Sequence, residues 1–141
     1  MHRKPLYLRG HINGELTSRM LVDGGASVNL MPWSTCQKLG VRLEDLVKTD
    51  MVLSAFTGGP TEAKGDLIAK LAVGSKTLPT AFFVVDAKGS YSVLLRRDWI
   101  HANCCVPSTM HQTLIQWNED DVEIVRAGTS ATIAMAGPEA N

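Results

Sequence analysis

The chain has 141 residues, of which 45% are hydrophobic and 20% charged, and its 14 basic residues balance its 14 acidic ones. This length supports one domain with a real core and excludes two large ones, and the composition excludes a disordered chain. The absence of net charge gives no electrostatic reason to expect nucleic acid or a membrane surface as a partner.

Targeting signals and disulfides are not expected. No apolar run approaches the roughly 18 residues that a membrane-spanning helix needs, and the basic start, MHRKPLYLRG, lacks the apolar segment of a secretory signal. The three cysteines, Cys36, Cys104 and Cys105, include an adjacent pair and are odd in number, which makes a poor disulfide framework. We therefore expect a protein of a reducing compartment, the cytoplasm.

The first third of the chain predicts a β-hairpin, a loop and a short helix. Asn13-Gly14 is the strongest short-range hairpin signal and joins strands in PLYLRGHI and ELTSRMLVD. Pro32 suits a first helical turn and Gly40 a helix stop, so a helix is expected over Pro32–Leu39. Residues expected to face inward are Leu6, Leu8 and Gly10 in the first strand and Leu16, Met20 and Val22 in the second.

The following segments predict further short strands. DMVLSAF is one, TGGPTEAKG is a glycine-rich reversal, and DLIAKLAVG alternates apolar residues from Leu67 to Val73. Another strand is centred on Phe82–Val85, and YSVLL is a buried strand before a helical turn or two in RRDWIHA. CCVPSTMHQTLIQW is expected to form a hairpin around Pro107-Ser108. Strands this short, with one or two small helices, predict an all-β barrel or sandwich.

The character of the chain changes after Trp117. Residues 118–141 begin acidic and end in small residues without clear periodicity, so we expect a domain over residues 1–117 and a linker or tail over 118–141. Within that tail, VEIV has the composition of one additional strand.

Asp23 is the residue that most needs an explanation. It follows the apolar run MLV and precedes GGASVNLM, so the carboxylate ends a buried strand against backbone without side chains. An Asx-type turn is one explanation, since such turns are common. The other is a catalytic carboxylate, because small residues allow a second, symmetry-related carboxylate to approach and share a proton. The backbone N–H groups of Gly25 and Ala26 are expected donors to this carboxylate.

At this point the sequence resembles the retropepsin-like aspartic proteases. LVDGGASVNLMP is similar to their Asp-Thr/Ser-Gly-Ala loop, and VLLRRDWIHANC to their second conserved segment, an apolar strand followed by Gly-Arg-Asp or Gly-Arg-Asn and a short helix. The amino-acid sequences of both segments are most similar to those of proteases in the polyproteins of plant long-terminal-repeat retrotransposons of the Gypsy type. The resemblance covers Leu6 to Trp117 and implies a small closed barrel of the retropepsin (acid protease) type with one or two short helices.

The resemblance also implies roles for individual residues. Asp23 would be the catalytic aspartate of an aspartic endopeptidase, working as a homodimer on an extended polypeptide without any cofactor or metal. The remaining implied site residues are Gly24, Gly25, Ala26 and Ser27 in the active-site loop, Phe56, Thr57, Gly58 and Gly59 in the flap, and Arg97 and Asp98 as the pair that braces the loop. For Gly58-Gly59, an ordinary hairpin end is an equally good interpretation.

Two positions depart from the family pattern. Gly24 lacks the hydroxyl of the usual Thr or Ser, which links the two loops of the dimer in the family. Arg96 replaces a glycine, and a side chain there would enter a crowded crossing and add strain if the backbone had a positive φ. These departures keep open an alternative function, a catalytically weakened or inactive dimerisation or peptide-binding module.

A zinc site is a further alternative. His101, Cys104, Cys105 and His111 lie close together in sequence, and zinc takes such ligands. Their spacing matches no standard finger pattern, so buried thiols and a surface histidine explain them better, and no metal site is predicted.

Overall fold

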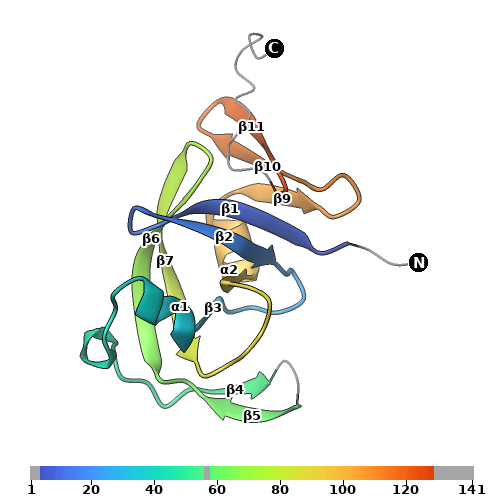
Figure 1. The fold of residues 1–141 in the computed structure, drawn as a ribbon. Coiled ribbons are helices and arrows are strands. Elements are labelled where there is room, and N and C mark those ends of the chain that lie inside the picture. The colour runs from blue at the N-terminus through green and yellow to red at the C-terminus, as the bar shows by residue number, and fades with distance from the viewer. Residues whose placement is uncertain (1–3, 56–57, 129–141) are drawn as a thin grey trace.

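The computed structural model describes residues 4–55 and 58–128, in which short strands predominate (Figure 1). Six strands close into a barrel in the order β1-β2-β8-β3-β7-β6, as predicted for the fold class. The barrel strands are β1 (Leu6–Ile12), β2 (Glu15–Val22), β3 (Leu30–Pro32), β6 (Gly65–Val73), β7 (Lys76–Val85) and β8 (Val93–Leu95). The other elements are α1 (Trp33–Lys38), a 3-10 helix (Leu43–Asp45), β4 (Val52–Ala55), β5 (Gly58–Glu62), α2 (Arg97–Ala102), β9 (Cys105–Ser108), β10 (Thr113–Asn118) and β11 (Asp121–Arg126).

The predicted β1–β2 hairpin is confirmed, but one residue that was expected to face inward does not do so. The two strands are antiparallel around Asn13-Gly14, and a register shift places one more residue in β2 than in the facing part of β1. Arg19, in this irregular stretch, has φ of 58°. The bulge turns Thr17 and Met20 inward together and leaves Leu16, expected in the core, 56% exposed.

The long β6–β7 hairpin provides the largest wall of the barrel. Alternate β6 residues from Leu67 to Val73 are buried, which confirms the predicted alternation. The predicted helix is also confirmed to within one residue at each end, with Pro32 and Leu39 flanking α1. On its inner face Cys36 is fully buried, and Trp33 and Leu39 are half-buried against the core.

Two parallel barrel strands determine where the functional residues lie. β2 and β8 pair with the register Met20↔Val93 and Val22↔Leu95. The apolar runs MLV and VLL are therefore side by side, and the next residues along the two strands are Asp23 and Arg96. Because both strands run in the same direction, the two charged residues that end them emerge at the same level of the barrel.

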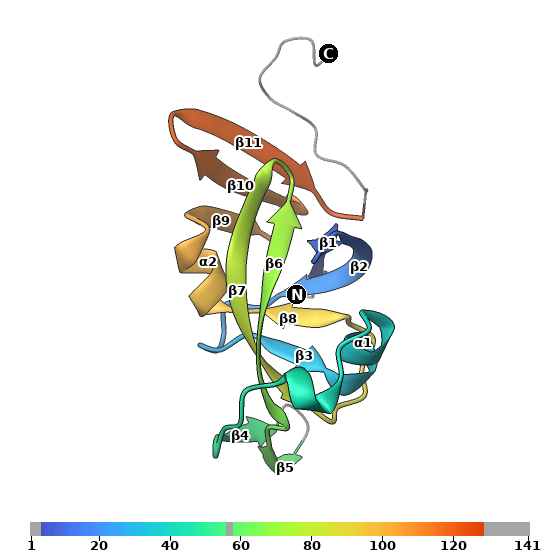
Figure 2. The same cartoon turned by 90° about the vertical axis from the view of Figure 1, so that its left-hand side faces the viewer.

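The C-terminal part forms a three-stranded sheet, β11-β10-β9, at one end of the barrel (Figure 2). The predicted hairpin is present, but its turn lies between Ser108 and Thr113 rather than at Pro107-Ser108, which still pair with β10. The strand that VEIV allowed is β11, and its Val125 is only 2% exposed. The expected domain boundary at residue 117 thus falls inside this sheet, and residues 129–141 of the expected tail lie outside the described residues.

The β4–β5 hairpin lies at the opposite end of the barrel from the C-terminal sheet, as both views show (Figures 1 and 2). The two strands pair from Val52↔Glu62 to Ala55↔Gly58. The segment expected to be only a glycine-rich reversal therefore contains a strand, because backbone hydrogen bonding to β4 outweighs the poor strand propensity of Gly58 and Gly59.

Candidate active site

Asp23 lies immediately after β2, and its backbone is fixed to the end of β8. Its N–H donates to Leu95 O at 2.9 Å, and its carboxylate Oδ1 accepts from the Gly25 N–H at 2.9 Å. The second bond is the Asx-type contact, so Asp23 does form the turn that its sequence allows. The side chain remains 32% exposed, which leaves part of the carboxylate open to solvent or to another molecule.

Arg96 faces the other carboxylate oxygen. Its Nε lies 3.4 Å from Asp23 Oδ2, and its side chain is only 9% exposed. The backbone of Arg96 is extended, with φ of −114°, so the strain expected from a positive φ does not arise. A residue larger than glycine fits here because its side chain runs toward Asp23.

The beginning of α2 is hydrogen-bonded to the loop that follows Asp23. Arg97 donates from its backbone N–H and its Nε to Ala26 O, at 3.1 and 3.2 Å, and from Nη2 to Ser27 Oγ at 2.9 Å. Asp98 contributes its backbone N–H, which donates to Ser27 O at 2.9 Å. Ser27, expected only as a member of the loop, thus joins it to both Arg97 and Asp98.

Asn29 is a site residue that the sequence interpretation missed. It is 2% exposed, its Oδ1 accepts from the Arg96 N–H at 2.8 Å, and its Nδ2 donates to Ala81 O at 3.0 Å. Its amide group therefore connects the loop, the end of β8 and β7. The sequence did contain a signal for it, a polar residue between the apolar Val28 and Leu30. An amide buried at such a position needs hydrogen-bond partners.

An apolar cluster borders the charged pair. Leu30, Val85 and Leu94 are buried in it, and Tyr91 is half-buried against it. Burial raises the pKa of the Tyr91 hydroxyl, and the nearby charge of Arg96 opposes that effect.

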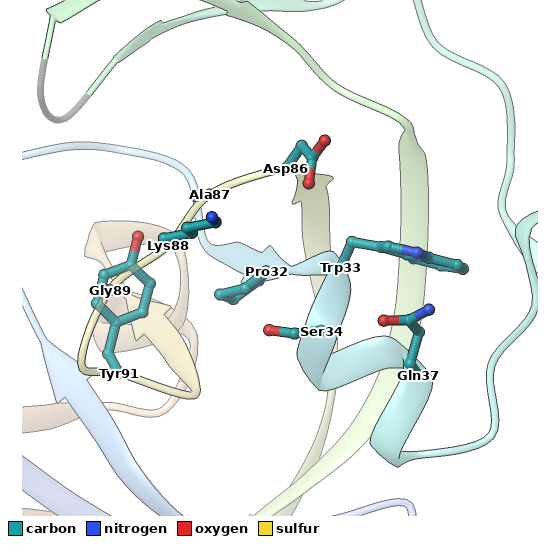
Figure 3. A pocket seen from close by; sticks show the side chains of 9 residues that line it. All are labelled: Pro32, Trp33, Ser34, Gln37, Asp86, Ala87, Lys88, Gly89 and Tyr91. Carbon is teal, nitrogen blue, oxygen red and sulfur yellow. The ribbon is translucent and has the colours of Figure 1, made fainter.

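Tyr91 also lines a cavity of about 280 Å³ between the start of α1 and the segment 86–91 (Figure 3). Trp33 and Gln37 approach it from α1, and Asp86 and Lys88 from the opposite segment. Neither Asp23 nor Arg96 is among the residues that line this cavity.

The flap residues are described only in part. Gly58 and Gly59 begin β5, whereas Phe56 and Thr57 lie outside the described residues. Gly58-Gly59 therefore belong to a hairpin in the place that the family order implies, and a role over a substrate stays a prediction.

The alternative zinc cluster does not assemble. Within the described part of the chain, no group of three or more His, Cys, Asp or Glu residues could hold a metal ion. Cys105 is buried with its thiol toward Ile100 O, Cys104 is exposed, and His111 Nδ1 is 3.0 Å from Ser108 Oγ. No helix within residues 4–55 and 58–128 is long and apolar enough to cross a membrane.

Comparison with solved structures shows that other proteins share this fold. The retroviral protease-like domain of Ddi1 from Leishmania major has a TM-score of 0.68 at 22% identity, covering 92% of this chain and 98% of that one. A retropepsin-like aspartic protease from Rickettsia conorii has a TM-score of 0.58 at 19% identity, and the match covers 86% of this chain and 89% of that one. The EIAV protease, complexed with the inhibitor HBY-793, has a TM-score of 0.56 at 19% identity, and the match covers 72% of this chain and 88% of that one.

The chain therefore has the closed-barrel fold of these retropepsin-like structures. Residues 8–101 match the family described as "gag-polyprotein putative aspartyl protease", and the chain belongs to this family. None of the curated proteins matches the sequence.

Proposed function

We propose that this protein is an aspartic endopeptidase whose active site forms when two copies associate and each contributes Asp23. The observation that carries the proposal is the fixed, partly exposed carboxylate of Asp23, held by Gly25 and Leu95 at the end of a barrel strand. The family and the shared fold support an aspartic-type peptidase.

The chemistry requires two carboxylates. Of two like charges in contact, one keeps a proton, which gives a base and an acid from identical residues. The base would activate a water molecule and the acid would protonate the carbonyl oxygen of the scissile peptide. Because the chain contains one such loop, a second copy is the simplest source of the partner carboxylate.

The proposed substrate is a polypeptide bound in extended form between the Asp23 loops and the β4–β5 hairpin, through main-chain hydrogen bonds. The family name points to a gag polyprotein as the substrate. The amino-acid sequences of the two segments around Asp23 and Arg97 favour a plant retrotransposon of the Gypsy type as its source. We propose that this activity is cytoplasmic and needs no cofactor.

Replacing Asp23 by Asn tests the proposal. The variant keeps the shape of the side chain but cannot act as a base, so peptide cleavage should fall at least a thousandfold while sedimentation still shows a dimer. An Asp50→Asn variant, altered at an exposed carboxylate away from the loop, should keep full activity. Undiminished cleavage by Asp23→Asn would remove Asp23 from the mechanism.

A second function is favoured by Gly24 and Arg96. With no hydroxyl at position 24 and a cation against Asp23, the same barrel could bind peptides or dimerise without cleaving. Peptide binding of equal strength by the native chain and by Asp23→Asn, with no cleavage by either or by Arg96→Gly, would support this module in place of the enzyme.

A further inference from the structure

The ion pair between Arg96 and Asp23 follows directly from strand register. The parallel pairing Val22↔Leu95 brings the next residue of each strand to the same level, and the Asp23 N–H is bonded to Leu95 O. Asn29 Oδ1 accepts a hydrogen bond from the backbone N–H of Arg96 at 2.8 Å, which fixes the backbone from which the arginine side chain starts.

Both carboxylate oxygens of Asp23 are thereby engaged within its own chain. Oδ1 accepts from Gly25, and Oδ2 lies 3.4 Å from Arg96 Nε. A guanidinium stays charged over the whole range in which proteins are folded. The Arg96 side chain is 9% exposed, so water screens its charge weakly.

This contact opposes the chemistry that a pair of aspartates performs. The pair works with its two carboxyl groups close together, and the Asp23 oxygen that lies 3.4 Å from Arg96 Nε is less available to a second carboxyl group or to a water molecule. An oxygen that faces a guanidinium is also less available to the hydroxyl of a transition-state analogue such as pepstatin. Tyr91 lies across the apolar cluster within reach of the Arg96 charge, and Arg97 and Asp98 follow Arg96 in sequence.

We propose that Arg96 is an intrachain restraint on Asp23, a positioning residue that engages one carboxylate oxygen and lowers the activity of the assembled site. The inference rests on the proposed endopeptidase function and concerns the regulation of that same site.

The test compares Arg96→Gln, Arg96→Gly and Arg96→Lys with the native chain, in a peptide-cleavage assay and in calorimetric titration with pepstatin. Losing the charge in Arg96→Gln and Arg96→Gly should raise kcat/KM at least tenfold, mainly through kcat, and tighten pepstatin binding at least tenfold. Arg96→Lys keeps the charge and should stay within threefold of the native chain. Lys70→Gln removes an exposed positive charge on β6 and should change neither value.

Several results would overturn the inference. The first is that Arg96→Gln cleaves peptides and binds pepstatin no better than the native chain does. Because glutamine keeps most of the side chain, this variant still tests the inference if Arg96→Gly fails to fold. Another is an equal gain in Arg96→Lys and Arg96→Gln, which would show that packing acts rather than charge. If the native chain already cleaves as fast as Arg96→Gln and Asp23→Asn does not cleave, the proposed function stands and the restraint falls. If no variant cleaves or binds pepstatin, both fall.

Discussion

At the scale of single residues, Asp23 is held from two sides by groups of very different character. Gly25 offers a backbone N–H, which suits a carboxylate in either a structural turn or an active site. Arg96 offers a buried cation, which a structural turn does not need. Replacing Asp23 therefore also removes the carboxylate that faces this cation, so measurements of activity need a parallel measurement of unfolding.

The three thiols provide a residue-scale prediction about pH. Burial raises the pKa of Cys36 to about 11, and burial also raises that of Cys105, where Asn103 and Lys76 oppose the effect. Only the thiolate reacts with iodoacetamide, so these two thiols should stay unreactive at pH 8, and Cys36 should begin to react only as the pH approaches 11. Cys104 is exposed and should react alone in the folded chain.

Mass spectrometry after alkylation checks this, with unfolded protein as the reference in which all three thiols react. A Cys104→Ser variant should give no rapid modification when folded. Rapid labelling of Cys36 at pH 8 would contradict the buried position of α1.

Asp23, Cys36 and Arg96 show how much of a single residue's role a sequence can predict. Asp23 was identifiable because an acidic residue between an apolar run and two glycines is unusual, and Cys36 because it lies on the inner face of a short helix. The contact of Arg96 with Asp23 depends on the parallel register of β2 and β8, which join segments about seventy residues apart. No local pattern encodes that register, although both apolar runs end at a charged residue.

At the scale of elements, β11 is fastened to the barrel by a polar network around Glu123. Its carboxylate accepts from the Ser75 N–H and Oγ and from Gln116 Nε2, and Gln116 also donates to Val73 O. The network joins the β6–β7 turn to both strands of the last hairpin. The acidic run NEDDVE suggested a solvated tail, because the sequence does not show that one of its acids has these partners.

Substitution of Gly74 tests this network. Gly74 has φ of +60°, and a Cβ there would lie 2.6 Å from Glu123 Oε2 and 2.8 Å from Gln116 Nε2. Gly74→Ala should lower the free energy of unfolding by about 3 kcal/mol, combining left-handed strain of about 1–2 kcal/mol with the displaced hydrogen bonds.

Gly14→Ala is the matched control, since Gly14 has φ of +85° and nothing lies within 4 Å of its added Cβ. Urea unfolding of both variants should show the smaller loss, about 1–2 kcal/mol, for Gly14→Ala. Equal losses would mean that the Glu123 network does not hold the turn.

At the scale of the whole molecule, a zero formal net charge favours self-association, which the proposed two-chain site requires. The fold class was predictable from short strands and two conserved segments, and the closed six-stranded barrel confirms it. The contacts of β11 were not predictable, because the partners of its Glu123 in the β6–β7 turn lie far away in sequence.

Gly24 gives a prediction about the dimer. A Cβ added at this position would have Ile100 Cδ1, at 4.0 Å, as its nearest neighbour, so a serine fits without displacing anything. If the two loops meet across a two-fold axis, the Gly24→Ser hydroxyl should add a hydrogen bond of about 0.5–1.5 kcal/mol and tighten the dimer roughly two- to tenfold. Sedimentation equilibrium measures this, and Gly24→Ala, which adds the carbon without the hydroxyl, should show no gain. A dimer of unchanged strength in Gly24→Ser would place the two loops apart.

The joint use of two Asp23 carboxylates is tested most directly by adding folded, dimerising Asp23→Asn chain in increasing excess to a fixed amount of native chain and measuring peptide cleavage. Mixed dimers then contain a single carboxylate, so the rate should fall toward zero as the excess grows, while an equal excess of Asp50→Asn should not lower it. An unchanged rate under a large excess of Asp23→Asn, with mixed dimers present by sedimentation, would show that one chain cleaves alone and would contradict the two-chain active site.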